Sequence, residues 1–76
     1  MELSEASIRR VFQRVGGKKI RVSKKARKLM SEAIYEIMKD IASEATNLAF
    51  ARGQLTVTEE DIRNAISIVF SRKVKT

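Results

Sequence analysis

The sequence predicts a single all-α domain in which a long central helix lies between two short helices. The 30 residues from Ser23 to Arg52 contain neither Gly nor Pro, and their apolar residues recur at steps of three and four for about eight turns of helix. Shorter segments with the same periodicity flank this stretch, and connections that contain Gly separate them. We therefore expect helices at about 4–15, 24–52 and 59–71, loops at 16–23 and 53–58, and a short basic tail at 72–76.

The central helix has an apolar stripe along its whole length and a signal at each end. Ser23 is a favourable N-cap, and Gly53 is the residue type most common just beyond a helix C-terminus. Such a helix would be about 44 Å long, whereas a globule of this size has a radius of gyration of only about 11 Å. The short flanking segments cannot cover the stripe, so we expect a second chain to bind it. Its residues are Ala26, Leu29, Met30, Ala33, Ile34, Ile37, Met38, Ile41, Ala42, Ala45, Leu48 and Ala49.

The composition excludes several sources of stability and several classes of function. With no Cys and no His, the chain lacks disulfides, Cys/His metal sites and the common nucleophile–base pairs of enzymes. The three Gly do not form a phosphate-binding loop, and we expect neither catalysis nor a cofactor. No apolar run approaches the ~20 residues that span a bilayer, and residues 1–5 lack the features of a signal peptide. We expect a soluble intracellular protein that gains stability by oligomerising.

Positive charge is concentrated in the N-terminal part of the chain. Sixteen Lys and Arg stand against nine Asp and Glu, and ten of the sixteen lie between residues 9 and 28. No acidic residue occurs between Glu5 and Glu32. A surface that serves solubility alone intersperses the two signs. This segregation therefore favours a polyanionic partner, either nucleic acid or an acidic membrane surface, over a basic protein that is merely soluble.

The first predicted helix carries a row of cations opposite its apolar side. Ser4 caps this helix and residues 16–17, both Gly, end it. Its apolar side consists of Ile8, Val11, Phe12 and Val15. On the other side Arg10, Arg14 and Lys18 follow at steps of four, which would align them on one face. Two interpretations of this row stay open, an ordinary solvated face and a site for phosphate, with which Arg and Lys form charge-assisted hydrogen bonds.

The start of the central helix is the strongest indication of an anionic partner. Its first turns contain Lys24, Lys25, Arg27 and Lys28. Cations at this end oppose the helix dipole, at a cost of ~0.3–1 kcal/mol each at low salt, and a bound anion would remove that cost. The preceding residues 19–22 alternate polar and apolar like a short extended segment, which could pair with residues 55–57.

The third predicted helix begins with the opposite charge. Thr58 is its expected N-cap, residues 59–60 are both Glu, and Asp61 completes a capping-box-like pattern at the third position. These three acids suit the positive end of the helix dipole. We expect its buried face to consist of Ile62, Ala65, Ile66, Val69 and Phe70.

The order of the helices and several short runs resemble an archaeal histone over nearly the whole chain. The matching residues are Met1-Glu2-Leu3, Ile8, Arg10, Arg21-Val22-Ser23, Asp40-Ile41-Ala42-Ser43-Glu44-Ala45, Leu48-Ala49, Gly53, Thr56-Val57 and Glu60-Asp61-Ile62. The resemblance implies a histone fold that forms an intertwined handshake dimer, with antiparallel central helices and the first loop of one chain beside the second loop of the other. It also implies binding to double-stranded DNA through backbone and minor-groove contacts with little sequence preference.

The predicted DNA-binding residues come from this resemblance and from the charge pattern. They are Arg10, Arg14, Lys18, Lys19, Arg21, Lys24, Lys25 and Thr56. The resemblance implies that Arg10 contacts phosphate from the first helix and that Arg21 enters the minor groove, with Thr56 of the partner chain as its neighbour. The first loop is two residues longer than is usual in the family, with an extra lysine and Ile20. Gln54 and Leu55 of the second loop stand where basic residues are common, so we expect that loop to contact phosphate less.

Two further sets of residues concern contacts between chains. The predicted dimer interface consists of Leu29, Met30, Ala33, Ile34, Ile37, Met38, Ile41, Ile62 and Ile66. The resemblance also implies a contact between dimers through Leu48, Ala51, Asp61 and Asn64. Ala51 stands where the family commonly has histidine and Asn64 where it has an apolar residue, which weakens the expectation that dimers stack.

The clamp that joins the second loop to the third helix in the family is also altered. Gln54 replaces the usual arginine partner of Asp61. Arg52 or Arg63 could take over that role, and the sequence does not choose between them.

The expected function is that of a chromosomal DNA-packaging protein, a homodimer that bends, wraps or compacts duplex DNA on the chromosome in the cytoplasm. The alternative is a histone-fold subunit that pairs with another histone-fold chain in a transcription or chromosome-attachment complex. A third reading, a basic peptide for acidic membranes, is disfavoured because the cationic cluster spans a loop and two helix ends, not one helix face. We expect no small-molecule substrate.

Overall fold

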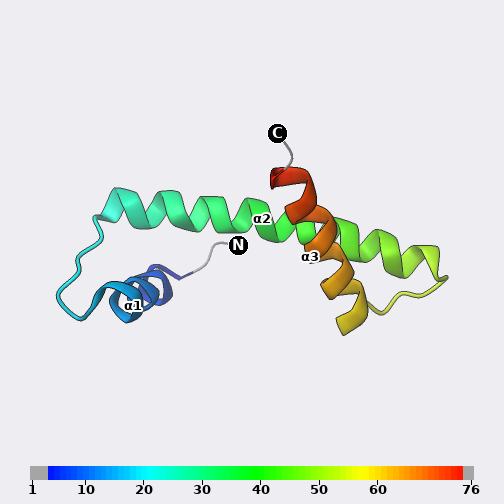
Figure 1. The fold of residues 1–76 in the computed structure, drawn as a ribbon, viewed down its shortest axis with the longest axis horizontal. Helices are drawn as coiled ribbons and strands as arrows, with labels where there is room; N and C mark the ends of the chain where they lie inside the picture. Colours follow the sequence, from blue (N-terminus) through cyan, green and yellow to red (C-terminus); the bar gives the residue numbers. More distant parts are fainter. Residues whose placement is uncertain (1–3, 75–76) are drawn as a thin grey trace. The chain divides into compact units, whose positions relative to one another are not determined.

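The computed structural model describes residues 4–74, with side chains for residues 4–72, and contains three α-helices (Figure 1). These are α1 (Glu5–Gly16), α2 (Lys24–Ala51) and α3 (Glu59–Val74). The predicted all-α fold with a long central helix is confirmed. Among the described residues, none of the three helices is long and apolar enough to cross a membrane. The chain forms two compact units, unit 1 up to Glu36 and unit 2 from Ile37 onward.

Helix α3 is longer than the sequence pattern predicted. It continues to Val74, beyond the expected end at residue 71, because no Gly or Pro follows Phe70 to interrupt it. The expected basic tail therefore begins inside a helix, and residues 75–76 of that tail lie outside the described residues.

Each helix begins at a hydroxyl side chain that caps its N-terminus. The side-chain oxygens of Ser4, Ser23 and Thr58 each accept a hydrogen bond from the N–H group three residues later, at 3.2, 3.1 and 3.3 Å. These N–H groups belong to the first turn, where a helix provides no acceptor of its own. All three predicted N-caps are confirmed.

A glycine with positive φ lies just beyond the C-terminus of α1 and of α2. Gly17 has φ 96° and ψ 162°, and its N–H donates to the carbonyl four residues earlier at 2.9 Å. At the end of α2, Gly53 has φ 71°, and the N–H of Gln54 donates to the carbonyl of Ala49 at 2.9 Å. The second arrangement is a Schellman motif, in which the left-handed residue is usually Gly.

Unit 1 contains α1, the first loop (residues 17–23) and the part of α2 up to Glu36. Ile8 is only 2% exposed and lies with Phe12 at a small apolar hollow that also includes Met30 and Ile34 of α2. Val15, predicted on the buried side of α1, is instead 84% exposed, and Val11 is also exposed. The apolar side of α1 is wider than the surface that one neighbouring helix can cover.

Unit 2 contains the rest of α2, the second loop (residues 52–58) and α3, which crosses α2 (Figure 1). Its buried apolar residues are Ala45 and Ala49 of α2 and Ala65 and Val69 of α3. These small side chains let the two helices pack closely, since the distance between packed helices depends on the side chains at their contact. In the single chain α3 contacts α2 through its small residues, so the burial expected for its larger residues stays a prediction about the dimer. The exposed large residues are Ile62, Ile66 and Phe70.

Candidate nucleic-acid interface

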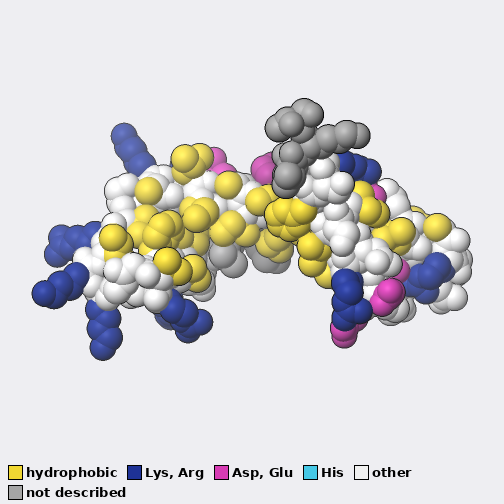
Figure 2. All heavy atoms as spheres, viewed as in Figure 1, with side chains coloured by type: hydrophobic (Ala, Val, Ile, Leu, Met, Phe, Trp, Pro, Cys, Tyr) yellow, Lys and Arg dark blue, Asp and Glu magenta, His cyan; other side chains and the backbone are white. Residues whose placement is uncertain are grey.

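Unit 1 exposes a concentrated positive charge. The ten cations between residues 9 and 28 are distributed over α1, the first loop and the first turns of α2, and nine of them are exposed. Figure 2 shows many of the Lys and Arg side chains, in dark blue, gathered around α1 and the beginning of α2. The elements of unit 1 therefore present cations from three successive segments of the chain on one small body.

Arg27 is the one cation of this group that is not exposed, because its guanidinium joins three segments. Its Nε donates to the Glu5 carboxylate of α1 at 3.1 Å, and its Nη1 donates to the Val22 carbonyl of the first loop at 2.6 Å. The sequence places Arg27 among the cations that oppose the α2 dipole, and this structural role was not predicted from it. One signal was present, since Glu5 is the last acid before Glu32 in a stretch of ten cations.

A hollow of about 630 Å³ lies between α1, the first loop and the start of α2. Its lining consists of Arg9, Gln13, Lys18, Lys19, Ile20, Arg21, Val22 and Arg27. We call it the basic hollow. It brings together three of the predicted DNA-binding residues, Lys18, Lys19 and Arg21. It adds Arg9, which sequence reasoning left out because Arg9 lies beside the predicted row of cations.

The predicted row of Arg10, Arg14 and Lys18 does not exist as one helical face. Helix α1 ends at Gly16, and the first loop then turns, with the N–H of Ile20 donating to the carbonyl of Gly17 at 3.1 Å. The prediction was wrong because steps of four align side chains only within a continuous helix. Lys18 lines the basic hollow, whereas the two arginines are exposed on α1 and do not.

The other predicted DNA-binding residues are not brought into the basic hollow. Lys24 and Lys25 are exposed at the first turn of α2 and do not line it. Thr56 is exposed in the second loop of unit 2. The assignment of these residues to DNA stays a prediction.

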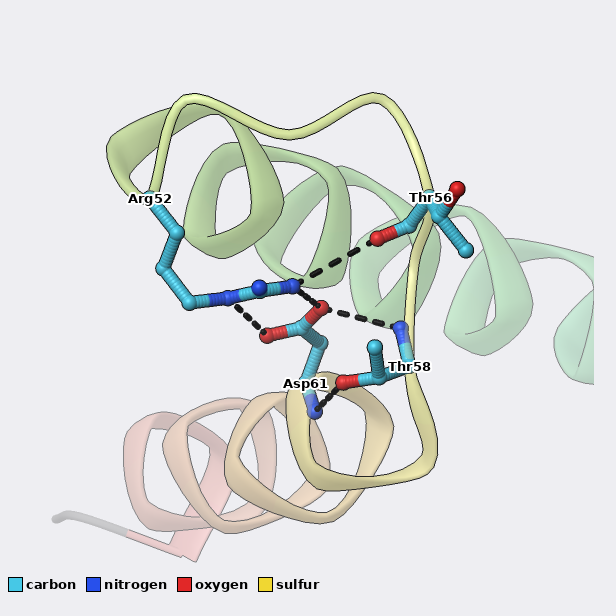
Figure 3. Close-up of polar contacts among 4 residues, drawn as sticks. All are labelled: Arg52, Thr56, Thr58 and Asp61. Carbon is cyan, nitrogen blue, oxygen red and sulfur yellow. Dashed lines mark hydrogen bonds and ion pairs between the residues drawn. The ribbon is translucent and has the colours of Figure 1, made fainter.

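The second loop is held to α3 by an arginine–carboxylate clamp (Figure 3). The Arg52 guanidinium donates to both carboxylate oxygens of Asp61, from Nε at 3.2 Å and from Nη2 at 2.5 Å, and Nη2 also donates to the Thr56 carbonyl at 3.4 Å. The Thr58 N–H donates to the same carboxylate at 2.9 Å. Of the two candidates that the sequence left open, Arg52 is therefore the partner of Asp61. Such a two-pronged contact is among the stronger polar interactions in proteins.

The clamp also determines the protonation of Asp61. The hydrogen bond from Arg52 and the one from the Thr58 N–H hold the pKa of Asp61 below its ordinary value of 3.8, and burial of the carboxyl opposes them only in part. Asp61 is only 3% exposed. Its carboxylate nevertheless stays ionised in the folded protein near neutral pH.

The arginines of unit 2 all have acidic partners among the described side chains. Arg63 pairs with Glu59 and, at 3.2 Å, with Glu60, while Arg72 of α3 pairs with Glu44 of α2 at 2.5 Å. With the Arg52 clamp, every described arginine of this unit is therefore neutralised locally. In unit 1, by contrast, Arg27 alone of the ten cations between residues 9 and 28 has an acidic partner among the described residues.

The residues implied to contact a second dimer lie together in unit 2. Leu48, Ala51, Asp61 and Asn64 all line one hollow of about 400 Å³. The carboxylate of Asp61 is already bound by Arg52 and Thr58 of its own chain. A contact between dimers at this hollow stays a prediction.

The predicted dimer interface is largely uncovered in the single chain. Leu29 is 67% exposed, and Met30, Met38, Ile62 and Ile66 are exposed as well. Half-buried members of the set are Ile34, Ile37 and Ile41, and Ala33 is exposed. Assignment of these side chains to an interface stays a prediction.

Comparison with protein families gives the same fold. The sequence matches the model of the family described as histone-like transcription factor (CBF/NF-Y) and archaeal histone, over residues 1–66. The match covers all of α1 and α2 and the first half of α3. The chain belongs to this histone family.

Membership of the histone family bears on several expectations at once. The predicted resemblance and the histone fold are confirmed, and histone-fold proteins of this family are not enzymes, as the sequence analysis expected. The family implies DNA binding and histone-fold partner chains in general. It includes both transcription-factor subunits and archaeal histones, and the match does not assign the chain to either branch.

Proposed function

We propose that this histone-family protein is a DNA-packaging homodimer, which binds duplex DNA with little sequence preference and bends, wraps or compacts it on the chromosome. The observation that supports this function best is the charge of unit 1. Ten cations lie between residues 9 and 28, and only Arg27 has an acidic partner among the described residues. Nine uncompensated cations on one small body form a surface that a polyanion can neutralise.

Duplex DNA has a density of negative charge high enough to neutralise these cations. It carries one negative charge per ~1.7 Å of helix axis, and each phosphate neutralised by Lys or Arg releases condensed counterions. Contacts of this kind position a protein on the backbone without reading the bases. A basic surface spread over two helices and a loop therefore favours general binding to duplex DNA over recognition of one short site.

The exposed apolar face supports the dimer. Fully burying one Val, Leu, Ile, Phe or Met side chain contributes about 1.5–3 kcal/mol, and Leu29 and Met38 are each more than half exposed in the single chain. Their burial against a second copy would contribute several kcal/mol to folding, which matters for a protein of 76 residues. In a handshake dimer the first loop, with Arg21, lies beside the partner's second loop, with Thr56.

The DNA-binding part of this proposal is tested by titrating duplexes of unrelated sequence at several salt concentrations. We expect similar affinities for all of them and a log–log salt dependence with a slope near −0.9 per phosphate neutralised. Arg21→Ala should weaken binding to every sequence, by up to about tenfold per lost phosphate contact at 0.1 M salt. The matched control is Arg63→Ala, because Arg63 is already neutralised by Glu59 and Glu60. A shallow slope, or preference for one short site, would overturn the proposal.

The homodimer is tested separately by sedimentation equilibrium of the purified chain. A stable, folded dimer supports a self-sufficient packaging protein. A monomeric or unfolded chain would contradict it and would favour the alternative, a subunit that pairs with a different histone-fold chain.

A further inference from the structure

One ion pair in unit 1 joins the beginnings of α1 and α2. Glu5 lies in the first turn of α1, and Arg27 lies near the start of α2, 22 positions later. The Arg27 Nε donates to the Glu5 carboxylate at 3.1 Å, while its Nη1 donates to the Val22 carbonyl at 2.6 Å. The planar guanidinium is thus bound in two directions at once, a geometry that the single ammonium group of lysine does not reproduce. We call these three residues the first-loop clamp.

The first-loop clamp restrains the backbone beside Arg21. The carbonyl that Arg27 holds belongs to the next residue, Val22. On the other side, the N–H of Ile20 donates to the carbonyl of Gly17 at 3.1 Å and closes the turn. Arg21 therefore lies between two residues whose backbone groups are hydrogen-bonded, while the residue itself is exposed. It is also the arginine that the family resemblance assigns to the minor groove.

We propose that Glu5 and Arg27 are positioning residues for DNA binding, which order the backbone at Arg21 before the duplex arrives. This inference rests on the proposed function, because it requires that Arg21 contacts the duplex. A flexible loop loses conformational entropy when it binds, and a loop that is already restrained loses less of it. Arg27 itself does not bind phosphate in this proposal, because its guanidinium is occupied within its own chain.

Charge alone predicts the opposite role for Glu5. It is the only acidic residue between positions 4 and 31, in the same unit as the ten cations between residues 9 and 28. A carboxylate repels a polyanion over distances up to the Debye length, about 10 Å at 0.1 M salt. Removing Glu5 would also release the Arg27 cation. If charge decides, loss of Glu5 tightens DNA binding, whereas if positioning decides, the same change weakens it.

The surroundings of the pair favour positioning. The Arg27 side chain is only 22% exposed, so most of it stays covered by unit 1 and is not free to reach a duplex. Salt screens the repulsion between an exposed carboxylate and DNA, since the Glu5 side chain is 49% exposed. The hydrogen bond to the Val22 carbonyl is partly buried, and salt screens such contacts much less.

The test measures duplex binding by the full chain with Glu5→Ala or with Arg27→Lys. We expect each change to weaken binding by about two- to fivefold, the range that a partly exposed ion pair supports. Arg27→Lys keeps the positive charge and leaves Glu5 in place at the start of α1, so it tests the clamp apart from the helix dipole. Its salt slope should equal that of the wild type, because no phosphate contact is lost. Glu32→Ala, which removes an exposed acid of unit 1 outside the first-loop clamp, is the matched control and should not weaken binding.

A second measurement uses the free protein and separates this inference from the proposed function. NMR order parameters of the amides of residues 17–22 should be near the ~0.85 of rigid backbone in the wild type and lower in both variants. If Arg27→Lys binds duplex as tightly as the wild type, or Glu5→Ala binds it more tightly, the positioning role is overturned and DNA packaging stands. If the order parameters fall as expected but the unmutated protein binds no duplex, the restraint on the first loop stands and the packaging proposal fails. The two variants break the contact from opposite sides, so a folding defect in one leaves the other as a test.

Discussion

The first loop and the second loop each connect two helices over seven residues, 17–23 and 52–58, yet their cations have different partners. In the second loop, Arg52 is held by Asp61 and by the Thr56 carbonyl of the same unit. In the first loop, Lys18, Lys19 and Arg21 have no acidic partner among the described residues. One loop is neutralised by its own chain, and the other exposes its charge.

This difference extends to the helices that follow the loops. Helix α3 begins with three acids, which suit the positive end of its dipole, whereas α2 begins with cations, which oppose it. The second loop therefore has its favourable electrostatics in the free protein. In the proposed function, a bound anion would give the first loop and the start of α2 the favourable electrostatics that they lack in the free protein. The second loop is therefore held within its own unit, and the first loop is the one assigned to binding by the proposed function.

The largest effect on folding is expected when the clamp of the second loop is broken. Asp61→Asn removes the carboxylate that accepts from Arg52 and from the Thr58 N–H, and it brings an amide N–H group close to the Arg52 donors. We expect a clear fall in the melting temperature, measured by circular dichroism. Glu60→Gln is the matched control, since Glu60 is exposed and its pair with Arg63 contributes little, about 0.2–1 kcal/mol at most. Equal melting temperatures for the two variants would contradict a structural role for the clamp.

The same clamp predicts how stability depends on pH. Because the pKa of Asp61 is lowered by folding, the unfolded chain takes up a proton at this site at higher pH than the folded chain does. The contribution of Asp61 is therefore complete above its ordinary value of 3.8 and is lost as the pH falls below it. In denaturant titrations, the difference in unfolding free energy between the wild type and Asp61→Asn should be constant near neutral pH and shrink below about pH 4. A difference that stays constant down to pH 2 would contradict the lowered pKa.

A smaller effect is expected from the two glycines with positive φ, one in each loop. Gly17, with φ 96° and ψ 162°, occupies a region that only glycine adopts readily, whereas Gly53, with φ 71°, is left-handed. Open space surrounds both positions, so a substitution tests the backbone alone. We expect Gly17→Asn to cost ~1–3 kcal/mol of unfolding free energy and Gly53→Asn to cost less, because Asn tolerates the left-handed region. Urea denaturation of both variants measures the costs, and a reversed order would refute this account of the first loop.

The smallest effect is expected from giving the second loop a positive charge. Leu55 is 91% exposed and lies next to Thr56, the predicted DNA contact of this loop. Leu55→Lys should raise duplex affinity by up to about tenfold at 0.1 M salt and steepen the salt dependence by ~0.9 per new phosphate contact. Leu55→Gln is the control of similar polarity without charge. No gain from the lysine would mean that the second loop lies away from the DNA backbone.

Most of the fold could be predicted from local patterns. The N-caps at Ser4, Ser23 and Thr58 depend on contacts with residues three positions away, which sequence spacing determines directly. The end of α3 was misplaced, because no Gly or Pro marks it. Val11 and Val15 are exposed in the single chain, because periodicity shows that a face is apolar but not which chain covers it.

The site was predictable in its charge and not in its geometry. Lys18, Lys19 and Arg21, which line the basic hollow, were predicted from the accumulation of cations in this part of the sequence and, for Arg21, from the family resemblance. The position of Arg9 in the basic hollow depends on how the first loop turns at Gly17, and no spacing rule describes that turn. Arg27 escaped notice because its partner Glu5 lies 22 residues earlier.

By itself, the sequence determined that this protein is an all-α member of the histone family with its positive charge segregated in one part of the chain. Helix periodicity, caps and charge runs depend on residues within about four positions of one another, so they can be read without coordinates. Only the tertiary structure decided that Arg52, and not Arg63, binds Asp61, and that Arg27 is paired while Arg9 faces the hollow. These hydrogen-bond partners depend on how segments that are distant in the sequence pack against one another. The sequence alone does not identify them, because two side chains interact only when packing brings them within hydrogen-bond distance.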